Sequence, residues 1–182
     1  MVGQVTLRPV MEDDLSWLGS LTSGPAATGP YEWHGWSDPQ GLRRSWAESG
    51  LLDDNCGFLI VLHGTDRVGV VDWHKVQVGR AVSNWTIGIG LAPEFRGRGY
   101  GSEAQQLLVR YLFAHAPVNR VEAITEIGNV AEQRALEKAG FTREGILRGR
   151  SFRQGRYRDD VIYGVLRDEV KLEDSASEDG TV

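Results

Sequence analysis

The stretch that most constrains the fold is a glycine-rich turn between an apolar run and a helix-like segment. The alternating apolar run at residues 85–91 is followed by three glycines at alternate positions, and then by a helix-like segment at residues 103–116. A strand that turns through glycines into a helix gathers backbone N–H groups at the positive end of the helix dipole. Arg96 and Arg98 add guanidinium groups whose forked donors suit phosphate oxygens. The sequence therefore predicts a site for a phosphorylated ligand at this turn.

Composition limits the kinds of partner. The 182 residues, of which 41% are hydrophobic and 25% charged, fit one globular domain. A net charge of −5 argues against a general nucleic-acid-binding face, which needs basic surface. No apolar run approaches the roughly 20 residues of a membrane helix. The single cysteine, Cys56, allows no intrachain disulfide, and the N-terminus lacks the basic and apolar regions of a signal peptide. We therefore expect a cytoplasmic protein with no nucleic-acid and no membrane partner.

The order of the predicted elements indicates a mixed sheet. A strand at residues 5–9 leads into two helices, which a loop at residues 24–30 separates; the second helix is expected to start at Asp38 and Pro39. Three strands joined by short turns come next, then a helix, a strand, a helix and two final strands. Consecutive strands imply an antiparallel meander, and the strand–helix–strand step through the glycine turn implies a parallel crossover.

These patterns predict a single α/β domain over residues 1–170. Its sheet is expected to be mixed and mostly antiparallel, flanked by helices, with one parallel crossover through the loop at residues 96–101. Residues 171–182 are acidic and polar with few apolar side chains, which predicts a disordered tail.

Two motifs resemble the signatures of the GNAT superfamily of N-acetyltransferases. Arg96, Gly99 and Gly101 fit its [Gln/Arg]-x-x-Gly-x-[Gly/Ala] loop, which holds the pyrophosphate of acetyl-CoA. About thirty residues later, Asn129 opens a helical segment that ends in Glu-Lys-Ala-Gly-Phe, as in the second signature of the family. The Gly-Tyr-Gly-Ser-Glu-Ala run and the Gly-x-Tyr-x-x-Asp pattern at residues 155–160 resemble the RimJ/RimL-like branch.

The resemblance implies acetyl-CoA as co-substrate and no metal. The pantetheine arm would pair with residues 89–92, where the strand splays from its parallel neighbour, and a backbone N–H of Leu91 or Ala92 would stabilise the oxyanion. Asn129 is expected to cap the following helix, to contact the cofactor arm, or both. The implied cofactor-binding residues are Leu91, Ala92, Arg96, Gly97, Arg98, Gly99, Tyr100, Gly101, Ser102 and Asn129.

The familiar acid and base of the family are missing from this sequence. Leu136 stands where many members carry a tyrosine, and Thr86 stands where the strand often carries a glutamate. Glu132 can protonate the departing thiolate if burial raises its pKa; otherwise it is an exposed helical glutamate. Asp72 and His74 share one face of a strand and are candidates for the base, directly or through water, or are polar residues of the sheet surface.

An aromatic cluster lies where the family places its substrate-facing loops. Tyr31, Trp33, His34 and Trp36 are candidates to line a pocket for an apolar or cationic group, whereas core packing of the two helices explains Trp17 and Trp46 just as well. We predict direct acetyl transfer to a primary amine of a small metabolite or antibiotic-like molecule. The alternatives are a protein acetyltransferase acting on a peptide N-terminus and a non-catalytic acyl-CoA-binding module. A homodimer is expected, because dimers are common in this branch.

Overall fold

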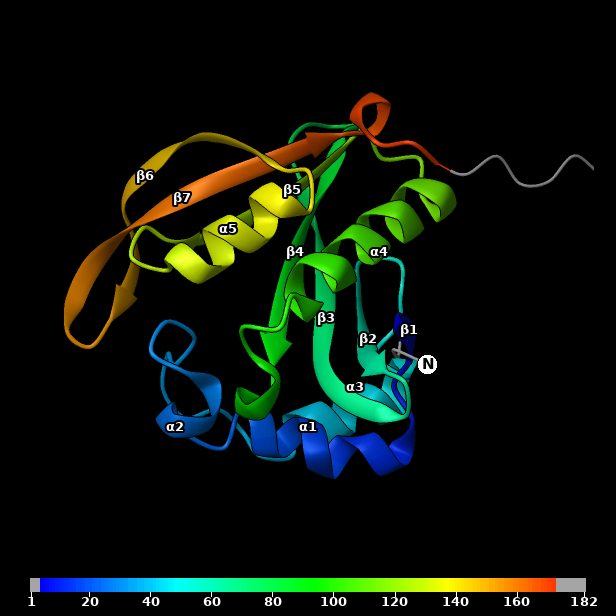
Figure 1. Ribbon diagram of the computed structural model, residues 1–182, viewed down its shortest axis with the longest axis vertical. Coiled ribbons are helices and arrows are strands. Elements are labelled where there is room, and N and C mark those ends of the chain that lie inside the picture. The colour runs from blue at the N-terminus through cyan, green and yellow to red at the C-terminus, as the bar shows by residue number, and fades with distance from the viewer. Residues whose placement is uncertain (1–3, 173–182) are drawn as a thin grey trace, which may run out of the picture.

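Seven strands form one sheet in the computed structural model, which describes residues 4–172 (Figure 1). The strands are β1 (Val5–Pro9), β2 (Cys56–His63), β3 (Asp66–Gln77), β4 (Ser83–Leu91), β5 (Arg120–Glu126), β6 (Thr142–Arg153) and β7 (Arg156–Leu166). Their order is β1-β2-β3-β4-β5-β7-β6, and every neighbouring pair is antiparallel except β4 and β5. The expected mixed, mostly antiparallel sheet with one parallel crossover is confirmed. The predicted tail at residues 171–182 falls almost wholly outside the described residues.

Helices cover both faces of the sheet. They are α1 (Leu15–Leu21), α2 (Pro25–Thr28), α3 (Gly41–Ser49), α4 (Tyr100–His115) and α5 (Val130–Lys138). Two details differ from the expectation. The short helix α2 lies in what was expected to be a plain loop, and Pro25 at its first position explains it, because the fixed φ of proline suits a helix start. The third helix begins at Gly41, since the Asp38 carboxylate accepts a hydrogen bond from the Gln40 N–H and forms a turn first.

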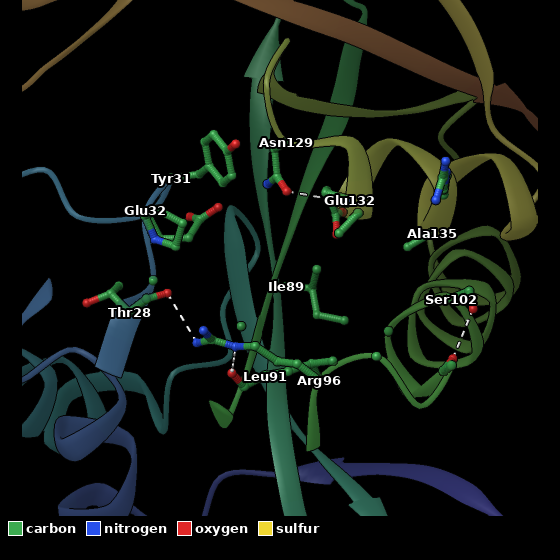
Figure 2. A pocket seen from close by; sticks show the side chains of 18 of the residues that line it. Thr28, Tyr31, Glu32, Ile89, Leu91, Arg96, Ser102, Asn129, Glu132 and Ala135 are labelled. Carbon is green, nitrogen blue, oxygen red and sulfur yellow. Dashed lines mark hydrogen bonds between the residues drawn. The ribbon is translucent and has the colours of Figure 1, made fainter. Parts of the chain in front are cut away.

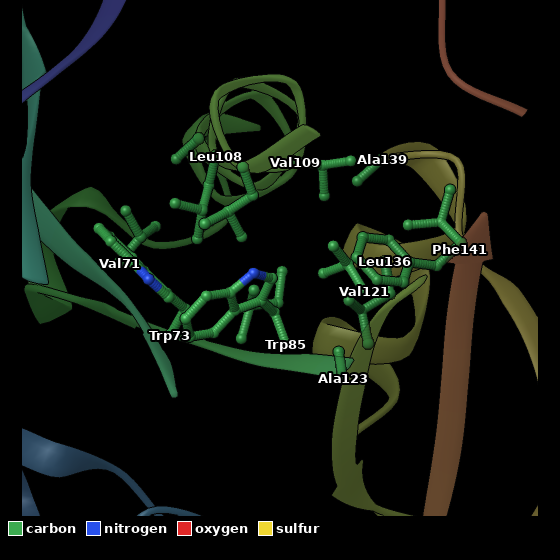
Figure 3. Close-up of a cluster of buried hydrophobic side chains, with 14 of the residues drawn as sticks. Val71, Trp73, Trp85, Leu108, Val109, Val121, Ala123, Leu136, Ala139 and Phe141 are labelled. Carbon is green, nitrogen blue, oxygen red and sulfur yellow. The ribbon is translucent and has the colours of Figure 1, made fainter. Parts of the chain in front are cut away.

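Strand β2 separates two hydrophobic clusters. Leu59 and Val61 join the large cluster beneath α4, whereas Ile60 joins the smaller one beneath α1 and α3. Alternate residues of a strand face opposite sides of a sheet, so a strand covered on both faces is apolar throughout. Figure 3 shows the large cluster, in which Trp73 and Trp85 of the sheet lie beneath Leu108 and Val109 of α4.

The parallel pairing of β4 with β5 is short, and this positions the site. It covers three residue pairs and ends where Ile87 faces Ala123. Beyond that point β4 continues to Leu91 paired with β3, and β5 continues to Glu126 paired with β7. The two strands therefore diverge and leave an open wedge beside the N-terminal ends of α4 and α5 (Figure 1).

Gly57 tests the packing of this core. It lies opposite Trp73, and a Cβ added to it would meet the Trp73 indole ring at 2.2 Å. Trp73 is 5% exposed, so its ring cannot move aside without disturbing the large cluster. We expect Gly57→Ala to lower the free energy of unfolding by about 1–3 kcal/mol in urea denaturation. Gly19→Ala in α1 is the control, because its Cβ meets nothing within 4 Å. A Gly57→Ala variant as stable as the wild type would contradict this packing.

Candidate active site

The wedge between β4 and β5 opens into a cavity of about 460 Å³ (Figure 2). Its walls come from the end of β4, the glycine turn with the first turn of α4, one face of α5, and residues 28–32 after α2. Figure 2 shows Ser102 and Ala135 on one side of the cavity, with Tyr31 and Glu32 on the opposite side. Segments far apart in the sequence thus meet around the end of β4, at the edge that does not pair with β5.

The glycine turn shapes one end of the cavity. Gly97 and Gly99 adopt left-handed backbone with φ of 75° and 90°, a conformation that favours glycine. Gly99 is the N-cap of α4, and its carbonyl accepts a hydrogen bond of 2.9 Å from the Ser102 hydroxyl. Gly101 brings the helix start close to β4, since a Cβ there would already touch the Leu91 and Ile89 side chains. The first N–H groups of a helix that begins at a cavity wall form a ready anion site.

The Arg96 side chain has a different task from the one predicted for it. Its Nε donates to the Leu91 carbonyl at 2.9 Å, and its Nη2 donates to the carbonyls of Ala27 at 2.8 Å and Thr28 at 3.2 Å. The guanidinium therefore ties the end of β4 to the segment that begins the opposite wall. A phosphate contact from residue 96 remains a prediction, and the backbone N–H of Arg96 also has a partner, the Pro93 carbonyl at 3.3 Å.

Arg98, Tyr100 and Ala92, which were also predicted to bind the cofactor, do not line the cavity. Arg98 is exposed and lies over the Phe95 ring, and the Tyr100 hydroxyl lies 3.3 Å from Nδ1 of His63. Ala92 is 2% exposed and is turned away from the wedge. The predicted residues that the structure brings together at the cavity are Leu91, Arg96, Gly97, Gly99, Gly101, Ser102 and Asn129.

The backbone at the end of β4 distinguishes the two predicted oxyanion donors. The Ala92 N–H donates to the Val68 carbonyl at 3.0 Å, so it is directed toward β3. Backbone groups of successive strand residues point to opposite sides, which directs the N–H of Leu91 into the wedge. The Leu91 carbonyl lies on that same side, where it accepts the hydrogen bond from Arg96. This geometry favours Leu91 over Ala92.

The N-terminal end of α5 supplies two further groups. Asn129 caps this helix: its Oδ1 accepts from the Glu132 N–H at 3.4 Å, and its Nδ2 donates to the Thr125 hydroxyl at 3.0 Å. The Glu132 carboxyl lines the cavity and accepts a hydrogen bond from Nε2 of Gln105 at 2.7 Å. Burial raises the pKa of Glu132 to about 7; the bond from Gln105 opposes this rise. Leu136 is fully buried in the large cluster, so an acid could not act from its position.

One carboxyl group, that of Glu32, lies on the opposite wall, and a second, that of Asp72, lies outside the cavity. Glu32 lines the cavity with solvent access, and partial desolvation by the surrounding protein raises the pKa of its carboxyl. Asp72 is half-buried on β3 beside Gly88, where a Cβ would lie 2.7 Å from Asp72 Oδ2. Burial raises the pKa of Asp72 to about 6; the charge of His74 opposes this rise and the charge of Glu32 adds to it. Asp72 lies outside the cavity wall, and His74 is exposed.

The aromatic segment reaches the cavity only through Tyr31. Its hydroxyl donates to the Gly128 carbonyl at 2.7 Å, which holds this segment against the start of α5. Trp33 and Trp36 pack edge to face with ring centroids 4.9 Å apart, and neither they nor His34 line the cavity. Trp36 is 82% exposed. Their role in acceptor binding remains a prediction.

Sequence reasoning missed several residues of the cavity wall. Glu32 lies between two of the predicted aromatic residues, but no spacing rule singles it out. Glu132 was predicted, and the helical repeat after Asn129 could have identified the other residues of α5 that line the cavity, namely Ala131, Arg134, Ala135 and Lys138. Among residues 4–172, no helix is long and apolar enough to cross a membrane. The same part of the chain contains no group of three or more His, Cys, Asp or Glu side chains that could hold a metal ion.

Comparisons of sequence agree with this architecture. The family profile described as the acetyltransferase (GNAT) domain matches residues 4–142. YokL of Bacillus subtilis (strain 168), an SPbeta prophage-derived uncharacterized N-acetyltransferase, is 30% identical over 131 residues, which are 71% of this chain and 72% of YokL. YdaF of the same organism, a putative ribosomal N-acetyltransferase, is 34% identical over 124 residues. That alignment covers 67% of this chain and 60% of YdaF, so the chain spans less than two thirds of this relative.

The structure of spermidine N-acetyltransferase from Vibrio cholerae, in complex with CoA and spermine, has the same fold. It superposes with a TM-score of 0.76 at 20% sequence identity, over 91% of this chain and 97% of that chain. The family profile covers more than half of the sequence, and the fold has the diverging strands and the helix capped by Asn129 that the resemblance predicts. The chain therefore belongs to the GNAT family of acetyltransferases.

Proposed function

We propose that this protein transfers an acetyl group from acetyl-CoA directly to a primary amine. The observation that carries the proposal is the wedge, in which β4 continues past its pairing with β5 beside the start of α4 at Gly99. The N–H groups of the first turn of α4 would hold the diphosphate of CoA. The free edge of β4 would hold the pantetheine arm, and the N–H of Leu91 would stabilise the oxyanion at the thioester carbon.

Two carboxyl groups suit the proton transfers of this reaction. A pKa of about 7 leaves much of Glu132 protonated near neutral pH, so it can give a proton to the departing thiolate. A pKa of about 6 leaves most of Asp72 ionised at the same pH, so it can accept the proton of the amine, directly or through water. We propose Glu132 as the acid and Asp72 as the base, with His74 as a further candidate.

The charges around the cavity favour a cationic acceptor. Glu32 lines it, and the negative charge of Glu32 acts on Asp72 strongly enough to raise the pKa of the Asp72 carboxyl. Arg134 and Lys138 line the cavity from the same helix as Ala135, on the side of Ser102, where phosphates would be placed. A small metabolite or antibiotic-like amine with a second positive charge would complement the carboxylates. The Vibrio cholerae enzyme, which was solved with spermine, gives a precedent within the fold.

The second candidate function is acetylation of a protein N-terminus. Its support is the relative YdaF, whose name describes a putative ribosomal N-acetyltransferase. A peptide would have to reach Leu91 past residues 28–32, which Arg96 holds against the end of β4. Membership of the RimJ/RimL-like branch and a homodimer belong to the proposal and rest on sequence resemblance. A cytoplasmic location belongs to it as well and rests on the single cysteine.

A charge substitution at Ser102 tests the donor site. Ser102→Glu places a negative charge where the diphosphate would lie, whereas an acid in the first turn is favourable for α4 itself. We expect the Kd for CoA, measured by calorimetry, to be about tenfold or more higher for Ser102→Glu than for Ser102→Gln. The glutamine variant has the same size without the charge. Equal Kd values in two folded variants would refute the placement of the diphosphate.

A panel of amines tests the reaction and its acceptor. We expect mass spectrometry to detect monoacetylated products from diamines and polyamines, with lower kcat/KM for amines that carry one positive charge. Glu32→Gln should raise KM for a diamine by about three- to tenfold, the effect of one partly screened charge pair. Glu48→Gln on the exposed side of α3 is the control, with no expected change. Acetylation of peptide N-termini alone would favour the second function, and CoA binding without any transfer would favour a non-catalytic module.

A further inference from the structure

Gln105 is a polar side chain buried in the packing of α4. It is 1% exposed, and its neighbours on the buried face of the helix are apolar, among them Ala104, Leu108 and Val109. Its Nε2 donates to Glu132 Oε1 at 2.7 Å, whereas its own Oε1 is buried without a hydrogen-bond partner among the described residues. Burying an amide with one unpaired end is unfavourable, and an apolar residue would fit this helix face better. The one hydrogen bond that the amide makes is to a carboxyl group of the cavity wall.

That hydrogen bond makes the two carboxyl oxygens of Glu132 different. Oε1 accepts the N–H of Gln105, and an oxygen that accepts a hydrogen bond in this way is the one that stays unprotonated. A proton on Glu132 therefore belongs on Oε2. Gln105 and Glu132 come from α4 and α5, which pack together, so the amide fixes the carboxyl from behind the cavity wall.

We propose that Gln105 is a positioning residue, which holds Glu132 so that its free oxygen delivers a proton to the departing CoA thiolate. The proposal rests on the proposed acetyl transfer. In that reaction the amine nitrogen forms a bond to the thioester carbon, and the carbon–sulfur bond breaks. The sulfur receives the proton of Glu132. The proton lost by the amine passes to Asp72 or water, and Glu132 is reprotonated from solvent before the next turnover.

The charged surroundings of Glu132 give this proposal a measurable consequence. Burial favours the neutral acid, the negative charge of Glu32 favours it further, and the N–H of Gln105 favours the carboxylate. Arg96, Arg134 and Lys138 also line the cavity, and their positive charges act in the same sense as the N–H of Gln105. Removing the amide while these groups stay in place should therefore raise the pKa of Glu132.

The first experiment measures this pKa without requiring any activity. Carbon-13 NMR of the labelled carboxyl, assigned by its loss in Glu132→Gln, follows the titration in the full chain. We expect Gln105→Met to raise the pKa of Glu132 by about one unit, the size that a hydrogen bond to a charged group supports. Methionine has nearly the same shape and suits a buried site. Gln105→Leu is the second variant if Gln105→Met does not fold.

Gln106→Met is the matched control. Gln106 is the next residue of α4, and its Nε2 also bonds to α5, at the Lys138 carbonyl 2.8 Å away, without touching Glu132. We expect no change in the pKa of Glu132 in this variant. An unchanged pKa in Gln105→Met and Gln105→Leu would overturn the proposal, whether or not an acceptor is found. If the wild type acetylates no amine, the proposed function fails, while the titration still decides whether Gln105 sets the state of Glu132.

Kinetics then decide whether the positioned proton is used. The kcat of the wild type should fall at alkaline pH, because Glu132 loses its proton there. In Gln105→Met this alkaline fall in kcat should occur about one pH unit higher, as the pKa of Glu132 does. The kcat of this variant at neutral pH should be about three- to tenfold lower than that of the wild type. In a Glu132→Gln background, Gln105→Met should change kcat less than about twofold, because the positioned proton is already absent. A shifted pKa with an unshifted alkaline limb would overturn the role of the pair in catalysis.

Discussion

The end of the parallel pairing between β4 and β5 at Ile87 is the constraint on which the rest of this site depends. If β4 paired with β5 along its whole length, the N–H and carbonyl of Leu91 would form hydrogen bonds with β5, and no backbone group at this edge would be free to bind a ligand. The antiparallel pairing of β4 with β3, and of β5 with β7, holds both strands in place after they separate. The wedge is thus held on its outer sides and open between them, and helices α4 and α5 both start beside it.

Arg96 joins the two halves of the cavity. Its guanidinium binds the Leu91 carbonyl at the end of β4 and the carbonyls of Ala27 and Thr28 across the cavity, so the donor loop and the wall that carries Glu32 are fixed to one another. The carboxyl of Glu32 on one wall and the first N–H groups of α4 on the other give the two sides of the cavity different charge. The same partial burial that makes these carboxyl groups costly to ionise brings two of their pKa values near neutrality, which proton transfer requires.

The sequence predicted those parts of the site that local rules determine. The glycine turn, the N-cap at Asn129 and the succession of strands along the chain follow from local backbone conformation, capping and apolar patterning, which operate over a few residues. Helix α2, the contact of the Arg96 side chain with the Thr28 carbonyl and the pairing of Gln105 with Glu132 could not be predicted in this way. The last two depend on segments 68 and 27 positions apart that meet only in the folded chain.

Hydrogen exchange at the end of β4 is the most direct measurement of the central claim. The account predicts that saturating CoA slows exchange of the Ile89 and Leu91 amides, which face the wedge. The Ala92 amide is the internal reference, because it already donates to Val68 and should be slow with or without CoA. Unchanged exchange at Ile89 and Leu91 in a protein saturated with CoA would contradict the claim that the unpaired edge of β4 binds the acyl donor.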